Sequence, residues 1–113
     1  MPYDEELASR IRELVRDEAK ANLTEKKMFG GLAFLIGGNM AIAASGQGGL
    51  LVRVDPEESD KLVSTTPAQP MEMRGREMKG WLRVGAADVR TKRQLSAWVR
   101  RGVGFARSLP PKS

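Results

Sequence analysis

The sequence predicts an α+β domain in two layers, in which an antiparallel sheet of about five strands is backed by helices. Apolar residues recur at helical spacing near both ends of the chain, whereas short apolar runs separated by glycine-bearing turns occupy the region between them. A further helix-start signal interrupts these runs near residue 55. The expected order is therefore a helix, roughly three or four strands, a helix, two strands and a final helix.

The first helix is expected to begin near Asp4, because Asp is a good N-cap and the acidic Glu5 and Glu6 suit the positive end of the helix dipole. The apolar positions that follow are Leu7, Ile11, Leu14 and Val15. Their spacing places them on one side of the helix, so this side should pack against the rest of the domain.

Short apolar or alternating runs follow the first helix and indicate an antiparallel meander. The runs are Lys26 to Phe29, Leu32 to Ile36, Met40 to Ala44 and Leu50 to Val54. The connections at Gly37-Gly38-Asn39 and Ser45 to Gly49 contain residues that tolerate the positive φ of tight turns. The first run is compatible both with a separate strand and with the beginning of the next one.

The second helix is predicted by Asp55-Pro56-Glu57-Glu58, because Asp is a good cap, Pro is favoured at the first helical position and acids suit the first turn. This helix should end at about Val63. Thr65 to Pro70 should form a loop, since its two prolines lack backbone donors. Two strands should follow, Met71 to Arg74 and Gly80 to Val84, connected through Gly75 to Lys79.

The final helix should start around Thr91, where Thr91 and Gln94 have the spacing of a capping box, and should stop at Pro110-Pro111. Its predicted buried face comprises Leu95, Trp98, Val99, Phe105, Ala106 and Leu109. Gly102 falls on the same face, which predicts a close backbone contact there.

Composition favours one compact domain over residues 1–113 with a flexible tail at 110–113, because a chain that is 41% hydrophobic can bury a modest core at this length. The chain has 0 Cys and 0 His, which excludes Cys or His metal ligation, thiol nucleophiles and Ser-His base pairing. The acidic start is unlike an export signal, and no apolar run reaches the roughly 20 residues of a membrane helix. We expect a cytoplasmic protein without a cofactor, a metal site or a membrane partner.

Charge is distributed unevenly, with a net charge of −4 over residues 1–60 and +9 over residues 61–113. A basic half of this kind can attract nucleic acid, although it is also typical of a solvated surface. On the final helix, Arg93, Arg100 and Arg107 form a stripe opposite the apolar face. The candidate anion or nucleic-acid contacts are Arg74, Arg76, Lys79, Arg83, Lys92, Arg93, Arg100 and Arg107.

Other patterns have structural interpretations. The glycine clusters lack phosphate-loop spacing and lead from strand to strand. Neighbouring carboxylates such as Glu57 and Glu58 point apart on a helix and suit its N-terminus. The strand-like runs contain Met28, Met40, Met71 and Met73. These methionines are expected to fill the core rather than to line an adaptable groove.

Several motifs resemble the N-terminal domain of the TfoX/Sxy family of bacterial competence regulators and their short relatives. The resemblance is carried by Met28-Phe29-Gly30-Gly31 with Phe34, Asn39-Met40-Ala41, Leu50-Leu51-Val52-Arg53, Met78-Lys79-Gly80-Trp81 and Ala106 to Pro111. It implies a short stand-alone member with a two-layer fold similar to that of secretion chaperones, and no catalytic residues. Structural roles are expected for the motif residues Met28, Phe29, Gly30, Gly31, Phe34, Asn39, Met40, Arg53, Gly80 and Trp81.

These observations favour a non-catalytic cytosolic protein-interaction module with a regulatory role, which binds through an exposed sheet face or edge and is a candidate homodimer. The alternative is a nucleic-acid-binding accessory protein that uses the basic C-terminal half. A small-molecule-binding protein or an enzyme of unknown type is the second alternative. Arg53 and Lys79 are the polar motif residues to test first.

Overall fold

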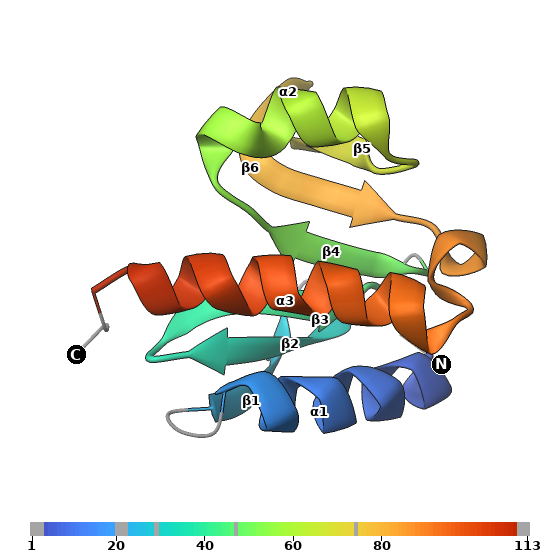
Figure 1. Cartoon of the computed structure of the whole chain (residues 1–113), viewed down its shortest axis with the longest axis vertical. Helices are drawn as coiled ribbons and strands as arrows, with labels where there is room; N and C mark the ends of the chain where they lie inside the picture. Colours follow the sequence, from blue (N-terminus) through green and yellow to red (C-terminus); the bar gives the residue numbers. More distant parts are fainter. Residues whose placement is uncertain (1–3, 20–22, 29, 47, 74, 111–113) are drawn as a thin grey trace.

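The computed structural model describes residues 4–19, 23–28, 30–46, 48–73 and 75–110. A helix, four strands, a second helix, two strands, a short 3-10 helix and a final helix follow one another along the chain in a compact arrangement (Figure 1). The elements are helix α1 (Glu5–Ala19), strands β1 (Leu23–Met28), β2 (Gly31–Ile36), β3 (Asn39–Ala44) and β4 (Leu50–Arg53), helix α2 (Pro56–Thr65), strands β5 (Gln69–Met73) and β6 (Arg76–Val84), the short 3-10 helix η1 (Ala86–Val89) and helix α3 (Lys92–Ser108).

The strands form one antiparallel sheet in the order β1-β2-β3-β4-β6-β5. This confirms the predicted α+β class. The described sheet has six strands because residues 23–28 form a separate strand that pairs with β2, which resolves one alternative left open by the sequence. Phe29, at the end of that predicted run, lies outside the described residues.

Strand β6 begins earlier than predicted, at Arg76, so residues 76–79 are not a connection but pair with β5. A register shift in this pair accommodates Gly80, which has a φ of 87°. The early part of β6 pairs with β5 alone, while β4 pairs only with residues 81–84. Its side chains are exposed, which explains why its polar sequence gave no strand signal.

The three helix starts predicted from capping residues are confirmed. The Asp4 carboxylate accepts the N–H of Leu7 at 3.1 Å, and α1 begins at Glu5. The Asp55 carboxylate accepts the N–H of Glu57 at 2.9 Å, and Pro56 is the first residue of α2. At α3, the Thr91 hydroxyl accepts the Gln94 N–H at 3.1 Å, and the Gln94 side chain accepts the Thr91 N–H at 3.1 Å. These bonds satisfy backbone donors that have no partner within the helix.

The three described α-helices contribute to the core on one face of the sheet, with α3 lying across β3 and β4 (Figure 1). We call this side the helix-covered face. The buried helix residues in this core are Leu7, Ala8, Ile11, Val15, Leu95, Trp98, Val99, Val103 and Ala106. The largest strand residue packed with them is Phe34, which is fully buried. The predicted apolar stripes are therefore confirmed, with Leu14, Phe105 and Leu109 only partly buried.

Gly102 allows α3 to approach β3 closely. A Cβ at this position would overlap the carbonyl oxygen of Ala41 and would lie 3.0 Å from Cγ2 of Val52. Ala41 is the extra residue where the register of β2 and β3 shifts, so Ala41 and the adjacent Ile42 both enter the core. The predicted backbone contact is thus present and requires glycine.

The two outer strands of the sheet differ in their side chains. On β1, Glu25, Lys26 and Lys27 are exposed. On β5, Pro70 has no backbone N–H to offer to a further strand. Charged side chains and proline are both features that discourage pairing at a sheet edge.

Candidate interaction face of the sheet

The side of the sheet that faces away from the helices carries a second apolar cluster. Its buried members are Ala33, Met40, Ala43 and Leu51. The residues that pack against them and remain partly exposed are Met28, Leu35, Met71 and Trp81. These eight residues all belong to strands, whereas the helix residues assigned to a cluster belong to the first one. We call this side the methionine face.

Four methionines lie on this face. Met40 is 5% exposed at its centre, and Met28 and Met71 pack against the cluster. Met78 is the partner of Met71 across the β5–β6 pair, so it projects to the same side, and it is 37% exposed. Met40 is buried as predicted, but in a cluster separate from the core beneath the helices. The side chain of Met73 lies outside the description.

Strand register assigns the basic side chains to faces, because side chains alternate along a strand and directly paired residues share a side. Lys26 pairs with Ala33, and Arg53 pairs with Trp81, so both belong to the methionine face. Arg83 follows Trp81 by two residues and pairs with Leu51, and Arg76 precedes Met78 by two, so both share the side of the methionine face. The irregularity at Gly80 interrupts the alternation, so Lys79, next to Met78, projects to the other side. The basic residues on the methionine face are therefore Lys26, Arg53, Arg76 and Arg83.

The acidic strand residues lie on the opposite side. Glu25 pairs with Phe34, and Glu72 adjoins Met71 and pairs with Glu77. Alternation therefore places all three on the helix-covered face, together with the basic Lys27. Among the described strand residues, the methionine face carries basic groups and no carboxylate.

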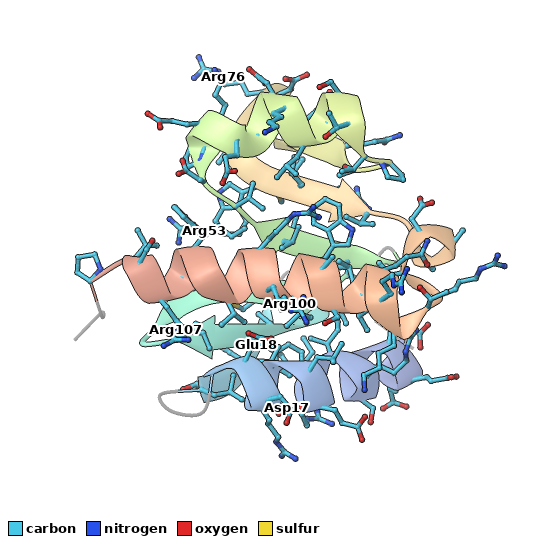
Figure 2. The ribbon with its side chains drawn as sticks, viewed as in Figure 1. Asp17, Glu18, Arg53, Arg76, Arg100 and Arg107 are labelled. Atoms are coloured by element: carbon cyan, nitrogen blue, oxygen red, sulfur yellow. The ribbon has the colours of Figure 1, made fainter. Side chains whose placement is uncertain are left out.

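Arg53 is held against two aromatic rings. Its guanidinium carbon lies 5.2 Å from the centroid of Trp81 on the methionine face and 5.5 Å from the centroid of Phe105 of α3, so it lies at the end of β4, where the methionine face borders α3. Both distances are within cation–π range. Figure 2 shows Arg53 between α2 and α3 in this view. Within the described residues its N–H groups have no hydrogen-bond or ion-pair partner.

The arginine stripe predicted on the final helix is partly used in packing. The Nε of Arg100 lies 3.4 Å from Oε1 of Glu18, and Arg107 donates to the backbone carbonyl of Glu18 at 3.4 Å (Figure 2). These contacts join α3 to the C-terminal turn of α1, where cations are favourable. Arg100 and Arg107 therefore have a structural role in the contact between the two helices.

The other predicted anion contacts are spread over several surfaces, with Arg76 and Arg83 on the methionine face. Figure 2 shows Arg76 far from Arg100 and Arg107. At the start of α3, where Lys92 and Arg93 are candidate anion contacts, Thr91 and Gln94 already cap the helix, so its first backbone donors do not require a bound anion. The remaining predicted contacts lie at the start of α3 (Lys92, Arg93), in β6 (Lys79, Arg83) and, for Arg74, outside the described residues.

Several motif residues have a clear structural role. Asn39 is 4% exposed, and its Nδ2 donates to the backbone carbonyl of Pro110 at 3.0 Å, which ties β3 to the end of α3. A Cβ at Gly31 would overlap the Ala44 carbonyl oxygen of the neighbouring strand. Gly30 and Gly80 adopt positive φ, at 76° and 87°. Glycine is needed at these positions by backbone geometry.

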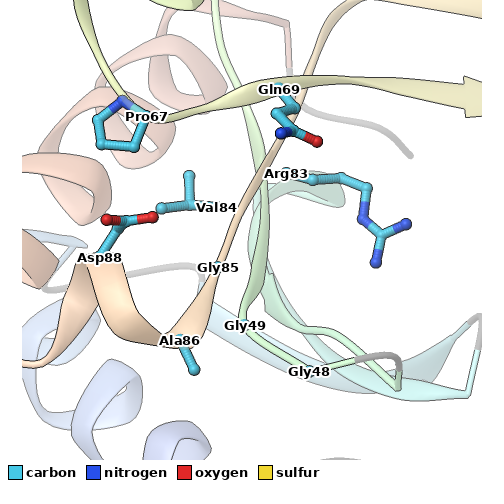
Figure 3. A pocket seen from close by; sticks show the side chains of 9 residues that line it. All are labelled: Gly48, Gly49, Pro67, Gln69, Arg83, Val84, Gly85, Ala86 and Asp88. Atoms are coloured by element: carbon cyan, nitrogen blue, oxygen red, sulfur yellow. The ribbon is translucent and has the colours of Figure 1, made fainter.

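A hollow beside a glycine turn lies at the ends of β4, β5 and β6 and has a volume of about 540 Å³. Figure 3 shows the Arg83 side chain directed away from the Asp88 carboxylate, which lies near Val84. The residues that line this hollow are Gly48, Gly49, Pro67, Gln69, Arg83, Val84, Gly85, Ala86 and Asp88. The charged groups therefore do not converge on one point in the hollow.

On the helix-covered face, Glu25 forms a two-bond ion pair with Arg12 of α1. The Nε–Oε2 distance is 2.6 Å, and the Nη2–Oε1 distance is 2.8 Å. The hydrogen bonds from Arg12 lower the pKa of Glu25 against the opposing effect of burial, with the charges of Arg12 and Arg16 acting in the same direction. This pair fixes the outer strand β1 to α1.

We expect Glu25→Gln to lower the free energy of unfolding by up to about 1 kcal/mol at pH 7, because the pair is partly exposed. A carboxyl whose pKa is lower in the folded than in the unfolded state stabilises the fold at pH values above its ordinary pKa of 4.5. This stabilisation is lost as the pH falls through the folded-state pKa. Urea denaturation of both proteins from pH 7 to pH 3 measures this effect. Curves that stay equally separated at every pH would contradict it, and the exposed Glu13→Gln serves as control.

Two features are not found in the described part of the chain. No group of three or more His, Cys, Asp or Glu side chains there is arranged to hold a metal ion. Likewise, no described helix is both long enough and apolar enough to cross a membrane.

Comparison with known families adds a finding to this geometry. The family model of the TfoX N-terminal domain matches residues 14–106, which is most of the chain. The chain therefore belongs to the TfoX N-terminal domain family, and the antiparallel sheet backed by helices is the fold of this member. Comparisons with curated proteins and with solved structures find no match.

Proposed function

We propose that this chain is a non-catalytic, cytoplasmic protein-interaction module with a regulatory role, and that it binds its partner through the methionine face. The observation that carries the proposal is the second apolar cluster, which strand residues form on the side away from the helices. Membership of the TfoX N-terminal domain family is compatible with such a role.

The side chains of the methionine face suit protein recognition. Methionine is flexible and polarisable, so Met28, Met71 and Met78 can repack around the apolar side chains of a partner. Trp and Arg are the residues most enriched among those that dominate binding energy, and Trp81 and Arg53 lie together at the edge of the cluster. Because these groups project from paired strands, the surface is largely preformed before a partner arrives.

Site-specific photo-crosslinking in cells tests this proposal. A photoreactive phenylalanine analogue would replace Met78 or Thr24, two exposed positions on the methionine face, and Glu13 on the outer side of α1 as control. We expect both methionine-face positions to crosslink to the same cellular protein, with no such product from Glu13.

The pattern of crosslinks distinguishes specific binding through the methionine face from nonspecific crosslinking over the whole surface. Equal crosslinking from Glu13, or different products from Met78 and Thr24, would contradict binding through the methionine face. A product of twice the chain mass from both positions would identify the partner as a second copy, which was the homodimer expected from the sequence.

Nucleic-acid binding is the second candidate function, favoured by the basic groups on the methionine face. Neutralised phosphates make affinity fall steeply with salt. The measurement is fluorescence anisotropy of a labelled single-stranded oligonucleotide titrated with protein at 50 mM and 200 mM salt. Affinity at low salt that falls roughly tenfold or more at high salt would support this function, and no binding at low salt would exclude it.

A further inference from the structure

We propose that the methionine face recognises an acidic, amphipathic segment of a partner protein, with Arg53 as the group that receives its carboxylate. This inference rests on the proposed function and specifies the chemistry of the partner. Three observations support it: the separation of charges between the sheet faces, the geometry of Arg53 and the apolar character of the surface around it.

The charged strand side chains that project from the methionine face are all basic. By strand register, Lys26, Arg53, Arg76 and Arg83 project from it, whereas the three described strand carboxylates project to the helix-covered face. At the β5–β6 edge, where the two sides meet, Glu72 and Glu77 line one hollow with Arg83. One of those carboxylates, Glu25, is already paired with Arg12. The four basic groups of the methionine face have no hydrogen-bond or ion-pair partner among the described residues. A negatively charged partner would supply the missing countercharge.

Arg53 is prepared to bind a carboxylate. The rings of Trp81 and Phe105 lie 5.2 Å and 5.5 Å from its guanidinium carbon and restrict the orientation of this group. A guanidinium presents its N–H donors in a planar fork that matches the two oxygens of a carboxylate. Since the side chain is half-buried and already oriented, less conformational entropy is lost on binding than at a mobile surface arginine.

The surface around Arg53 favours a polypeptide segment over a nucleic acid or a second copy of this chain. Nucleic-acid bases stack on free aromatic faces, but among the described residues Trp81 is the aromatic member of the methionine-face cluster, and Arg53 already lies over its ring. The rest of the cluster is aliphatic or thioether and suits apolar side chains. A symmetric dimer through this face would bring two sets of basic groups together, which is unfavourable.

Selection from a displayed library of random 12-residue peptides tests the inference with the intact protein as bait. We expect the selected peptides to combine Asp or Glu with apolar residues. Binding of the best peptide, measured by fluorescence anisotropy, should weaken about tenfold or more with Arg53→Gln. It should weaken less with Arg53→Lys, which keeps the charge without the planar fork, and should be unchanged with Arg93→Gln at the start of α3.

Circular dichroism and thermal unfolding establish that each variant is folded. If Arg53→Gln is unstable, Arg83→Gln tests a second basic group of the same face.

Selected peptides without acidic residues would overturn this inference but leave the interaction function intact, provided that they crosslink to the methionine face. An unchanged affinity of the acidic peptide for Arg53→Gln and Arg83→Gln would also overturn it. If a single-stranded oligonucleotide of equal charge bound more tightly than the peptide, and the same variants weakened its binding, the site would be assigned to nucleic acid instead. A library that yields no binder, together with no crosslink, would reject both proposals.

Discussion

Gly102→Ala is expected to destabilise the protein by about 2 kcal/mol or more, although alanine is the better helix former. The added Cβ would overlap the Ala41 carbonyl oxygen and press on Val52, and both groups belong to the sheet beneath α3. Backbone cannot move aside as a flexible side chain can, so the helix would have to shift away from the sheet. Urea denaturation followed by circular dichroism measures the change in the free energy of unfolding.

Gly104 on the same helix provides the matched control. It is exposed, and a Cβ there would meet nothing within 4 Å. Gly104→Ala should therefore stabilise the protein by about 1 kcal/mol through helix propensity alone. Stabilisation of similar size at both positions would show that α3 does not approach β3 as closely as the structure indicates.

Phe34→Ala is expected to cost about 3–5 kcal/mol, because it leaves a large cavity between the sheet and the helices. Phe34 is 0% exposed on the helix-covered face. Since small domains are stable by only about 5–15 kcal/mol, this variant should be close to unfolded at 37 °C. Thermal unfolding monitored by circular dichroism measures the loss.

The adjacent Leu35→Ala separates stability from binding. Leu35 is partly exposed on the methionine face, so its truncation should cost only about 1 kcal/mol and leave a folded protein. The same variant should reduce crosslinking from Met78 and Thr24 if the partner contacts this face. Equal destabilisation by Phe34→Ala and Leu35→Ala would contradict the assignment of the two faces.

Much of the fold could be predicted because its signals are local. Asp55 and Thr91 indicate helix starts because their side-chain oxygens can accept hydrogen bonds from N–H groups a few residues ahead, and both of these caps are present. Strand β1 and the start of β6 gave weaker signals. Both are exposed and polar, so neither has the apolar alternation that marks a strand buried on one side.

The candidate site depends on register, which the sequence did not reveal. Alternation showed that Met40 and neighbouring apolar residues share a side with buried groups, but not which face of the sheet the helices cover. The excess of basic residues was visible only as a gradient along the chain. Its separation by face follows from pairings such as Lys26 with Ala33 and Arg53 with Trp81. Contacts between distant helices, such as that of Arg107 with Glu18, also lie beyond local sequence patterns.

The outer strands constrain how association can occur. Exposed Glu25, Lys26 and Lys27 on β1, and Pro70 on β5, oppose the addition of a foreign strand, which is the route to aggregation for many open sheets. A partner that binds the methionine face would therefore use side chains and leave the backbone ladder intact. Surface substitutions could then change the partner without altering the fold, so family members with the same sheet are expected to diverge in the proteins that they bind.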